Sequence, residues 1–448
     1  MPETLCVDVG STFTKAVLVD DVTGRVRGMA STPTTVGTDV MDGYAAVLDA
    51  LVPPHSRAAP SPGGARPRVL MCSSAGGGLR LAVVGYERLV TAEAGRRVGL
   101  SAGAKVVHVG AGPLTGADVR ALRSSRPDIL LLVGGTDGGN SAVLLHNAGR
   151  LASARLKAPV VVAGNTDAVD EVMTVLGSTG RTAVATDNVL PRIGVIRPEP
   201  ARAAIRETFL HHVIGGKGLS RGRAFADLVQ AATPDAMLAG VEVLADVVSG
   251  DVMVVDIGGA TTDVYSVITP RGEDATLRKD VVETLWHGRT VEADLGMRWN
   301  ADGIVVAAHA ERLLLTDAAA SYAARVTGDI GHLPVDDGEW ALELELAQAA
   351  VTVAARRHAR PPSPSGRPRP LADTALLVGS GGVLRHADLD AAARVLDALR
   401  HDHAGGWRLP ERAAVTVDTA YVLFAVGLLA RVDRDVARRL AADIVAGQ

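Results

Sequence analysis

Several features that mark secreted, nucleic-acid-binding or membrane-spanning proteins are scarce in this sequence. Only two of its 448 residues are cysteine, and aromatic residues make up 3% of the chain. Because two thiols cannot form a disulfide framework, we expect Cys6 and Cys72 to be reduced, inert residues of buried strands in a cytoplasmic protein. The 46 basic residues nearly cancel the 50 acidic ones. No extended basic run has interleaved aromatics, so nucleic acid is not an expected partner.

Signal-peptide and membrane-span patterns are also lacking. Residues 1–15 (MPETLCVDVGSTFTK) pass into strand-like alternation without a basic and then an apolar region. The most apolar late stretch, residues 413–430, contains Asp418, whose charge would be costly in hydrocarbon. This stretch therefore predicts a strand followed by a buried helix, and no membrane is expected as a partner.

What the sequence does contain is the alternation of an α/β protein. With 47% hydrophobic residues, a chain of this length predicts roughly three domains. Short Val/Ile/Leu runs alternate with Ala/Arg/Leu-rich helical stretches, which is typical of α/β folds. The N-terminal block predicts strands at 4–9, 15–20, 25–31 and 68–73, with a helix at 39–51. A further α/β region is predicted by strands at 106–109, 129–133, 160–163 and 183–185, with a helix at 167–176.

The second half of the chain continues the pattern. Thr233 and Pro234 predict an N-cap and a first-turn proline for a helix that runs to about residue 248 and leads into a strand at 252–257. Further elements are predicted near 305–315 and 340–356 (helices) and at 413–431 (a strand and a helix). The segments 53–67 and 356–370, rich in Pro, Gly, Ser and Arg, predict solvated surface loops.

The first motif with chemical meaning is VDVGSTFTK, residues 7–15. Gly10 permits a tight turn, and the amides near Ser11 and Thr12 can point at phosphate oxygens. Lys15 offers a point charge to a β- or γ-phosphate, and Asp8 would hold water around a magnesium ion. A Gly-Ser-Thr hairpin turn is common, so this motif alone is weak evidence for a phosphate site.

A second motif, VVDIGGATTDVYSV at 254–267, repeats the same design and strengthens the first. An apolar strand ends in an aspartate and is followed by a glycine pair, two threonines and a second aspartate. The two motifs together predict a split cradle for ATP between two lobes. The phosphate-binding candidates of this second motif are Gly258, Gly259, Thr261 and Thr262.

Magnesium prefers oxygen ligands and keeps several of its own waters. Asp8, Asp256 and Asp263 are therefore the candidates that would hold the ion through water. Phosphoryl transfer also requires a group that orients the attacking oxygen. Asp256 is the predicted catalytic residue for that role.

The third motif is ALLVGSGGVLRH at 375–386. A buried strand is followed by glycines that allow the backbone to approach a flat or charged group. Following two phosphate hairpins, this turn predicts contact with adenosine through Gly379, Ser380, Gly381 and Gly382.

With these three motifs, the chain resembles the two-lobed ATPases that include actin, sugar kinases and heat-shock chaperone ATPases. The resemblance implies duplicated ribonuclease H-like domains, an inserted α/β region and nucleotide-controlled closure of the lobes. The helices at 234–248 and 418–430 would be the two connecting helices. The expected organisation is the first part of lobe I at 1–85, the inserted region at 86–232 and lobe II, with both connecting helices, at 233–448.

The chain also resembles a narrower family, glutamate mutase L, the accessory or reactivating proteins of adenosylcobalamin-dependent glutamate (methylaspartate) mutase. The resemblance implies an ATP-hydrolysing chaperone that uses ATP and Mg²⁺ and has mutase subunits as partners. It would help the mutase to exchange inactivated cobalamin or to stay assembled, and it is not itself a mutase. The matching stretches are SSAGGGLRLAVVG at 73–85, LLVGGTDGGN at 131–140, DNVLPRIGVIRPEPARAAIRETFLHHVIGGKG at 187–218, DIGGATTDVYSV at 256–267 and TVEADLGMRWNADG at 290–303.

Other residues of these stretches carry less chemistry. The turn at 134–140 is compatible with an anion-binding site and equally with a sharp strand-to-helix turn. Arg298 and Trp299 could either pack within lobe II or recognise a ligand or partner. His211 and His212 lack partners at metal-ligand spacing, so no metal is expected there. The Asp-x-His-x-x-Gly pattern of cobalt ligation is not apparent, so this chain is not expected to bind cobalamin.

Three other functions remain compatible with the motifs. A small-molecule kinase of the same fold would use the same hairpins, as would an ATPase resembling the hydantoinase and oxoprolinase subunits. A regulatory module that binds ATP without hydrolysing it is the third. No Gly-x-Ser-x-Gly elbow supports a serine hydrolase, and nothing in the pattern indicates an oligomeric state.

Overall fold

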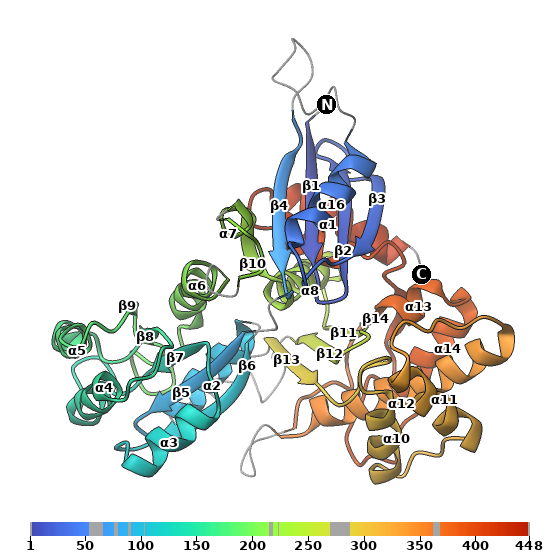
Figure 1. Ribbon diagram of the computed structural model, residues 1–448. Helices are drawn as coiled ribbons and strands as arrows, with labels where there is room; N and C mark the ends of the chain where they lie inside the picture. Colours follow the sequence, from blue (N-terminus) through green and yellow to red (C-terminus); the bar gives the residue numbers. More distant parts are fainter. Residues whose placement is uncertain are drawn as a thin grey trace.

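The computed structural model describes residues 2–52, 66–75, 79–87, 91–102, 104–214, 218–222, 224–268, 287–361 and 368–446. Within these residues the strands form three five-stranded sheets. Figure 1 shows lobe I at the top, lobe II at the lower right and an inserted region at the lower left.

Lobe I is built on a mixed sheet with strand order β10-β4-β1-β2-β3. The first three strands of the chain pair antiparallel, whereas β4 and β10 run parallel to β1. Helix α1 (Val40–Leu51) packs on this sheet. Its N-cap is Asp39, whose side chain accepts a hydrogen bond from the Met41 amide at 2.9 Å. The strands are β1 (Glu3–Val9), β2 (Phe13–Asp20), β3 (Val26–Pro33), β4 (Arg68–Ser73) and β10 (Val229–Ala232).

Lobe II repeats this topology with the order β13-β12-β11-β14-β15. Strands β11, β12 and β13 pair antiparallel, and β14 and β15 run parallel to β11. The duplication confirms the predicted two-lobed, actin-like ATPase fold. The strands are β11 (Val252–Ile257), β12 (Thr262–Val267), β13 (His287–Glu292), β14 (Leu376–Ser380) and β15 (Ala414–Val417), and the helices are α10 (Ala301–Ala310), α11 (Asp317–Gly328), α12 (Asp337–Ala359), α13 (Gly382–His386) and α14 (Leu389–Arg400).

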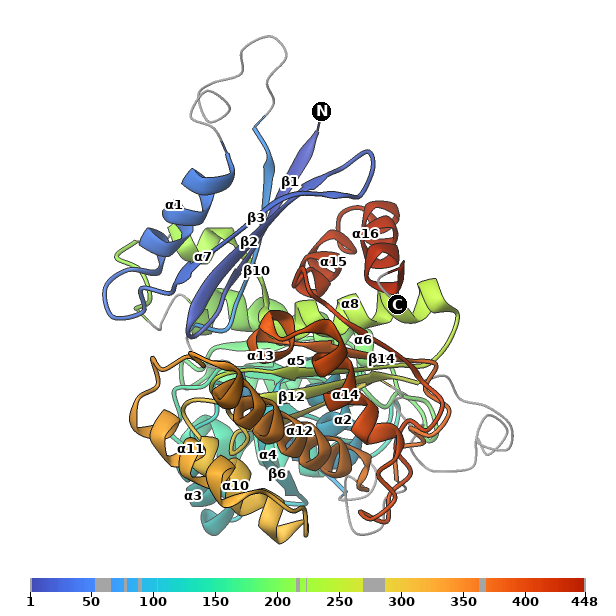
Figure 2. The ribbon, with the colours of Figure 1, turned by 90° about the vertical axis from the view of Figure 1, so that its right-hand side faces the viewer.

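Two connecting helices, α8 (Thr233–Val248) and α15 (Leu423–Leu429), lie between the lobes (Figure 2). They share one hydrophobic core with α16 (Arg434–Ala446) and with residues of both lobe sheets, including Cys6 and Cys72, which are buried as predicted. The helices cross very closely, because a Cβ on Gly427 would lie 1.7 Å from the Ala236 carbonyl oxygen. Glycine is required at such a crossing.

The inserted region is a separate parallel sheet with the order β6-β5-β7-β8-β9. Its first strand, β5, lies within the 1–85 segment expected to belong to lobe I, and β10 lies within the expected insert but completes the lobe I sheet. Strand pairing therefore places the sheet of the insert at 80–185. Between β4 and β10 the elements are β5 (Arg80–Gly85), α2 (Thr91–Ser101), β6 (Lys105–Ala111), α3 (Gly116–Ser124), β7 (Ile129–Leu132), α4 (Ala142–Ser153), β8 (Val160–Val162), η2 (Thr166–Ala168), α5 (Val169–Gly177), β9 (Ala183–Ala185), α6 (Pro198–Thr208), η3 (Phe209–Ile214) and α7 (Ala224–Leu228). The last of these, α7, contacts β4 and β10 of lobe I.

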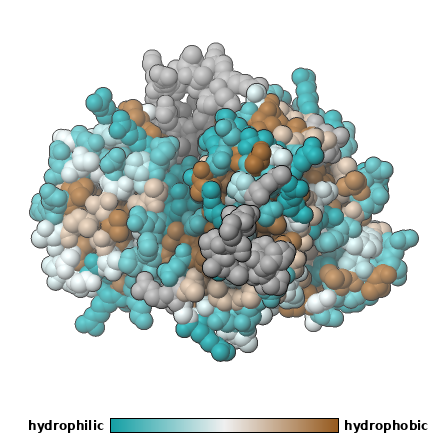
Figure 3. All heavy atoms as spheres, turned by 90° about the horizontal axis from the view of Figure 1, so that it is seen from above, coloured by the Kyte–Doolittle hydropathy of each residue, from teal (hydrophilic) through white to brown (hydrophobic). Residues whose placement is uncertain are grey.

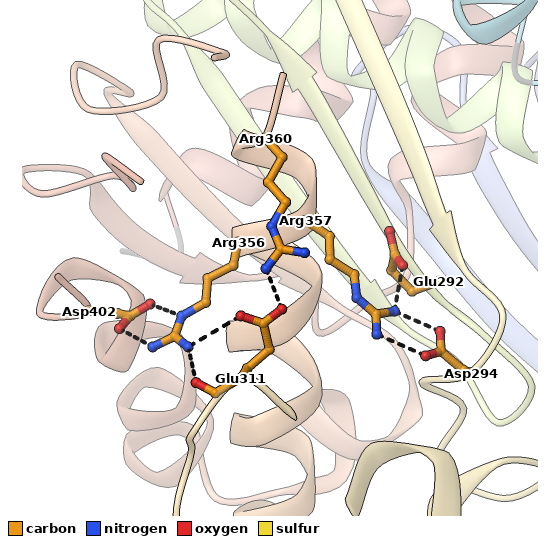
Figure 4. A network of polar contacts seen from close by, with 7 residues as sticks. All are labelled: Glu292, Asp294, Glu311, Arg356, Arg357, Arg360 and Asp402. Atoms are coloured by element: carbon orange, nitrogen blue, oxygen red, sulfur yellow. Dashed lines mark hydrogen bonds and ion pairs between the residues drawn. The ribbon is translucent and has the colours of Figure 1, made fainter. Parts of the chain in front are cut away.

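The loop predicted at 356–370 is wrong at its beginning. Helix α12 continues to Ala359, and Arg356 is only 1% exposed in its side chain. Figure 4 shows the reason: the Arg356 guanidinium binds both carboxylate oxygens of Asp402 at 2.7 Å and the carbonyl oxygen of Glu311 at 2.7 Å. A buried charge is tolerated when paired and hydrogen-bonded in this way. The rest of that loop at 362–367, and residues 53–65 of the other predicted loop, lie outside the described residues.

The surface viewed from above, over lobe I, intersperses polar and apolar residues (Figure 3). Among the described helices, none combines the length and the apolar character needed to cross a membrane.

Candidate functional site

The two predicted phosphate hairpins have the same turn geometry. In lobe I the Gly10 amide donates to the Phe13 carbonyl oxygen at 3.1 Å, and in lobe II the Gly258 amide donates to that of Thr261 at 2.9 Å. An added Cβ would lie 2.7 Å from the same oxygen at Gly10 and 2.9 Å from it at Gly258. Both turns therefore need glycine. Ser11 and Thr12 are exposed at the tip of the first turn.

The strand registers place different charges beside the two turns. Asp8 lies opposite Lys15 in the β1–β2 hairpin. Asp256 lies opposite Asp263 in the β11–β12 hairpin. Each lobe thus has a carboxylate at the same position of its hairpin. The residue opposite is a lysine in lobe I and a second aspartate in lobe II.

Asp8 is 2% exposed and held by donors from three other segments. The Thr233 hydroxyl donates to its Oδ1 at 2.6 Å, the Tyr421 hydroxyl to its Oδ2 at 3.2 Å, and the Cys72 thiol lies 3.6 Å from Oδ1. Burial raises the pKa of Asp8, whereas the Lys15 charge opposes that rise. The predicted N-cap role of Thr233 is wrong, because Thr233 is already the first residue of α8, Ala232 occupies the N-cap position without a side-chain hydrogen bond, and the Thr233 hydroxyl donates to Asp8.

Lys15 lies in the field of carboxylates from both lobes. Its Nζ is 3.4 Å from the centroid of the Tyr421 ring, a cation–π contact. Burial lowers the pKa of Lys15, and the charges of Asp8 and Asp256 counteract this effect. A positive charge is thereby placed at the junction of the two hairpins.

Asp256 is partly exposed, unlike Asp8. Burial of the carboxyl group, opposed by Lys15 and reinforced by Asp263, raises the pKa of Asp256 to about 6. A carboxylate with a pKa close to the operating pH is suited to accept a proton. The environment of Asp256 therefore fits the predicted catalytic role.

Three predicted residues of the second hairpin, Thr261, Thr262 and Asp263, have side chains engaged within their own lobe. Asp263 accepts a hydrogen bond from Arg289 at 2.8 Å and one from the Thr261 hydroxyl at 3.2 Å. The Thr262 hydroxyl is buried and donates to the Leu295 carbonyl oxygen at 2.6 Å. Their side chains thus stabilise the hairpin as it stands.

The predicted adenosine turn lies beside the second hairpin. Strand β14 runs along β11, with Ser380 opposite Asp256. Gly381 has φ of 102°, and a Cβ there would lie 2.1 Å from the Ile257 carbonyl oxygen. Gly379 and Ser380 end the strand, and Gly382, which is exposed, begins α13. The turn is therefore placed next to the phosphate hairpin of the same lobe.

Four residues that sequence reasoning did not assign to the site lie at this junction. Thr233 and Tyr421 donate to Asp8, and Arg385 of α13 acts electrostatically on Lys15. The Asp418 carboxylate accepts hydrogen bonds from the Val422 and Leu423 amides at 2.9 and 3.0 Å and so orients the start of α15. Of these four, only Asp418 stood out in the sequence, because it is the one charged residue of the apolar stretch 413–430.

The three predicted aspartates can be tested for their fit to a magnesium ion. Within the part of the chain that the structure describes, no three His, Cys, Asp or Glu side chains converge closely enough to hold a metal ion directly. Asp8 and Asp256 come from facing strand ends, and Mg²⁺ usually keeps several waters when it binds with nucleotide phosphates. The residues thus fit an ion held through water, to which Asp263 would contribute less because it is paired with Arg289.

Comparisons with solved structures give weak likenesses. The chain matches nucleotide-free acetone carboxylase at 14% identity (TM-score 0.41, 96% of this chain and 70% of that one) and the ATP-dependent caprolactamase of Pseudomonas jessenii at 15% (TM-score 0.39, 95% and 70%). It also matches the activator of 2-hydroxyisocaproyl-CoA dehydratase from Clostridium difficile with bound ADPNP, at 10% (TM-score 0.32, 99% and 96%).

Sequence comparisons are stronger. The protein is 34% identical over 451 aligned positions to Protein MutL of Clostridium tetanomorphum, and the alignment covers 95% of each chain. The family model described as "MutL protein" matches residues 4–445. The chain therefore belongs to the MutL protein family, the family that its sequence motifs indicated.

Proposed function

We propose that this protein binds Mg-ATP between its lobes and hydrolyses it to reactivate an adenosylcobalamin-dependent mutase, with glutamate mutase as the first candidate. The observation that carries the ATP site is the pair of equivalent glycine turns whose charged residues meet at Lys15. Membership of the MutL family supports the mutase as partner. Cobalamin would be exchanged on the partner, not on this chain.

The hairpins would enclose the phosphates from both sides. Backbone amides of the Gly10 and Gly258 turns would donate to phosphate oxygens, and Lys15 would face the β- or γ-phosphate. Magnesium, held through its waters by Asp8 and Asp256, would neutralise part of the phosphate charge. Gly379 to Gly382 would let the backbone approach adenosine.

Asp256 would orient the attacking water and accept its proton. The water oxygen bonds to the γ-phosphorus while the bond from that phosphorus to the β–γ bridging oxygen breaks, which releases ADP and inorganic phosphate. Because burial raises its pKa to about 6, the Asp256 carboxylate is a stronger proton acceptor than an ordinary aspartate and is still largely ionised at neutral pH.

Hydrolysis would act on the partner through the arrangement of the lobes. Both connecting helices cross between the lobes, and α8 begins at Thr233, whose hydroxyl binds Asp8. A ligand shifts such an equilibrium only by its different affinity for the two arrangements. The ATP and ADP states would therefore bind the mutase with different affinities.

The test is recovery of mutase activity. The host's mutase would be inactivated with hydroxocobalamin and incubated with this protein and adenosylcobalamin, with and without Mg-ATP. The proposal predicts recovery only with ATP and no recovery with Asp256→Asn, which should still bind ATP. If activity does not return and the mutase leaves hydrolysis unstimulated, the proposed function is wrong.

A further inference from the structure

A short turn in the insert presents apolar side chains to solvent. The Val195 amide donates to the Arg192 carbonyl oxygen at 3.0 Å, and Gly194 has φ of 83°, as the third residue of a tight turn requires. Ile193 is 72% exposed and Val195 is 40% exposed. We call residues 191–197 the docking turn.

The docking turn is firmly supported on both sides. The Pro191 carbonyl oxygen accepts from the Asp137 amide at 3.1 Å, and the Arg197 amide donates to the Val189 carbonyl oxygen at 2.9 Å. The buried Asn188 side chain donates to the Gly135 carbonyl oxygen at 3.0 Å and to Asp137 Oδ1 at 2.8 Å. The glycine-rich turn at 134–140 thus serves as a support for the docking turn. A backbone turn held in place in this way loses little entropy on binding.

Positive charge borders the apolar tip. Arg192 and Arg197 are both exposed and flank Ile193 and Val195 in the sequence of the turn. Apolar contacts at the centre of an interface supply affinity, and charges at its rim supply steering and register. This pattern is complementary to an apolar patch bordered by carboxylates on another protein.

The docking turn continues directly into a helix that is fixed to α8. Helix α6 begins at Pro198, and its Arg206 makes two hydrogen bonds to the α8 residue Asp235, at 2.5 and 2.8 Å. One turn earlier, Arg202 pairs with Glu242 of α8 at 3.3 Å. The first residue of α8 is Thr233, which binds Asp8. A contact at the docking turn is therefore joined to the nucleotide site through two helices.

We propose that the docking turn binds an apolar, carboxylate-bordered patch of the mutase, and that α6 links this contact to the nucleotide site. This inference rests on the proposed function and names the surface that the partner contacts. Leu314 is more exposed, at 98%, but it lies in the loop between α10 and α11. That loop belongs to lobe II and not to this pair of helices, so Leu314 offers a matched control.

Binding of the host's mutase to the full-length protein, measured by calorimetry with Mg-ADP present, tests the docking turn. Ile193→Glu should weaken the mutase Kd by roughly 10-fold or more, while the affinity for Mg-ADP stays unchanged. Leu314→Glu should leave both affinities unchanged. Arg192→Glu should weaken mutase binding and reduce its salt dependence.

Wild-type affinity for the mutase in Ile193→Glu overturns the inference while the proposed function stands. If the wild-type protein does not bind the mutase, the proposed function fails and the inference fails with it. The link through α6 has its own test in Arg202→Gln, which should bind the mutase normally but show less stimulation of ATP hydrolysis by it. Full stimulation in that variant overturns the link.

Discussion

The two lobes contain the same hairpin with different chemistry. Each has a strand-end aspartate and a glycine turn closed by one backbone hydrogen bond. Across from the aspartate stands Lys15 in lobe I and Asp263 in lobe II. Asp8 is buried among three donors, whereas Asp256 is partly exposed with a pKa raised to about 6. Duplication thus accounts for the shared geometry of the two hairpins. In the proposed mechanism, divergence at a few positions would give lobe I the positive charge of Lys15 and lobe II the proton acceptor Asp256.

The largest effect is expected from the strand-end aspartates. Asp256→Asn should lower the turnover of ATP at saturation by roughly 10²- to 10⁴-fold, because the proton acceptor is lost, while Mg-ATP still binds. Asp8→Asn is the matched change and should lower Mg-ATP affinity while turnover at saturation falls by less than about 10-fold, since Asp8 is not assigned the proton. Steady-state hydrolysis and calorimetry separate the two. Equal losses of turnover in the two variants would contradict the assignment of proton acceptance to Asp256 and not to Asp8.

The next largest effect is expected from Lys15, which lies opposite Asp8 in the lobe I hairpin. Lys15→Gln should weaken ATP binding by about 1.5–3 kcal/mol, roughly 10- to 150-fold in Kd, since a charged contact to phosphate is removed. Lys15→Arg, which keeps the charge, should retain most of the affinity. Unchanged ATP affinity in Lys15→Gln would place the phosphates away from lobe I.

A pH profile sharpens the assignment to Asp256. The carboxylate is ionised above its pKa, so kcat/KM for ATP should fall about 10-fold per pH unit below about 6. Lys15 opposes the rise of this pKa, so Lys15→Gln should move the midpoint upward. Asp256→Asn should remove this acid limb, and persistence of the limb there would assign it to another group.

The stability consequence of Asp256 has a definite sign. Its folded pKa of about 6 exceeds its ordinary value of 3.8, so the folded state binds the proton more tightly. Its contribution to the free energy of unfolding is therefore present below pH 4 and is lost as the pH rises through about 6. Urea unfolding midpoints of the wild type and of Asp256→Asn, measured across this pH interval, test the sign. The midpoint of the wild type should fall relative to that of the variant as the pH rises.

The smallest effect is expected at the turns themselves. Gly10→Ala and Gly258→Ala bring a Cβ to 2.7 and 2.9 Å from a carbonyl oxygen, so each should lower the free energy of unfolding by about 1–3 kcal/mol. Gly149→Ala in α4, where nothing lies within 4 Å, is the control and should be neutral or slightly stabilising. Urea midpoints measure all three. A large loss at only one turn would show that the turns are not equivalent.

The sequence predicted those elements whose signals are local. Glycine and threonine after an apolar strand predicted both hairpins, and the strands of both hairpins form as expected. A proline after Thr233 marked the start of α8 correctly. The boundary of the insert was misplaced because β5 has the same apolar pattern in either sheet, and only long-range pairing with β6 and β7 decides.

The remaining features depend on tertiary contacts. Nothing near Arg356 in sequence announces Asp402, which allows that arginine to be buried. Likewise Tyr421 reaches Asp8 only because the two lobes fold around the connecting helices. The motifs therefore named the hairpin residues but not the donors that surround them.

The most direct measurement asks whether one ATP contacts both hairpins. Ser11→Asp and Gly259→Asp place one negative charge at the same point of each turn, and both sites have room, since the nearest atom to a Cβ on Gly259 is 3.6 Å away. Val22→Asp, at an exposed turn between β2 and β3, is the control. In calorimetry with Mg-ATP, each hairpin variant should bind at least about 10-fold more weakly, and the control normally. Normal affinity in either hairpin variant would contradict a site shared by the two lobes.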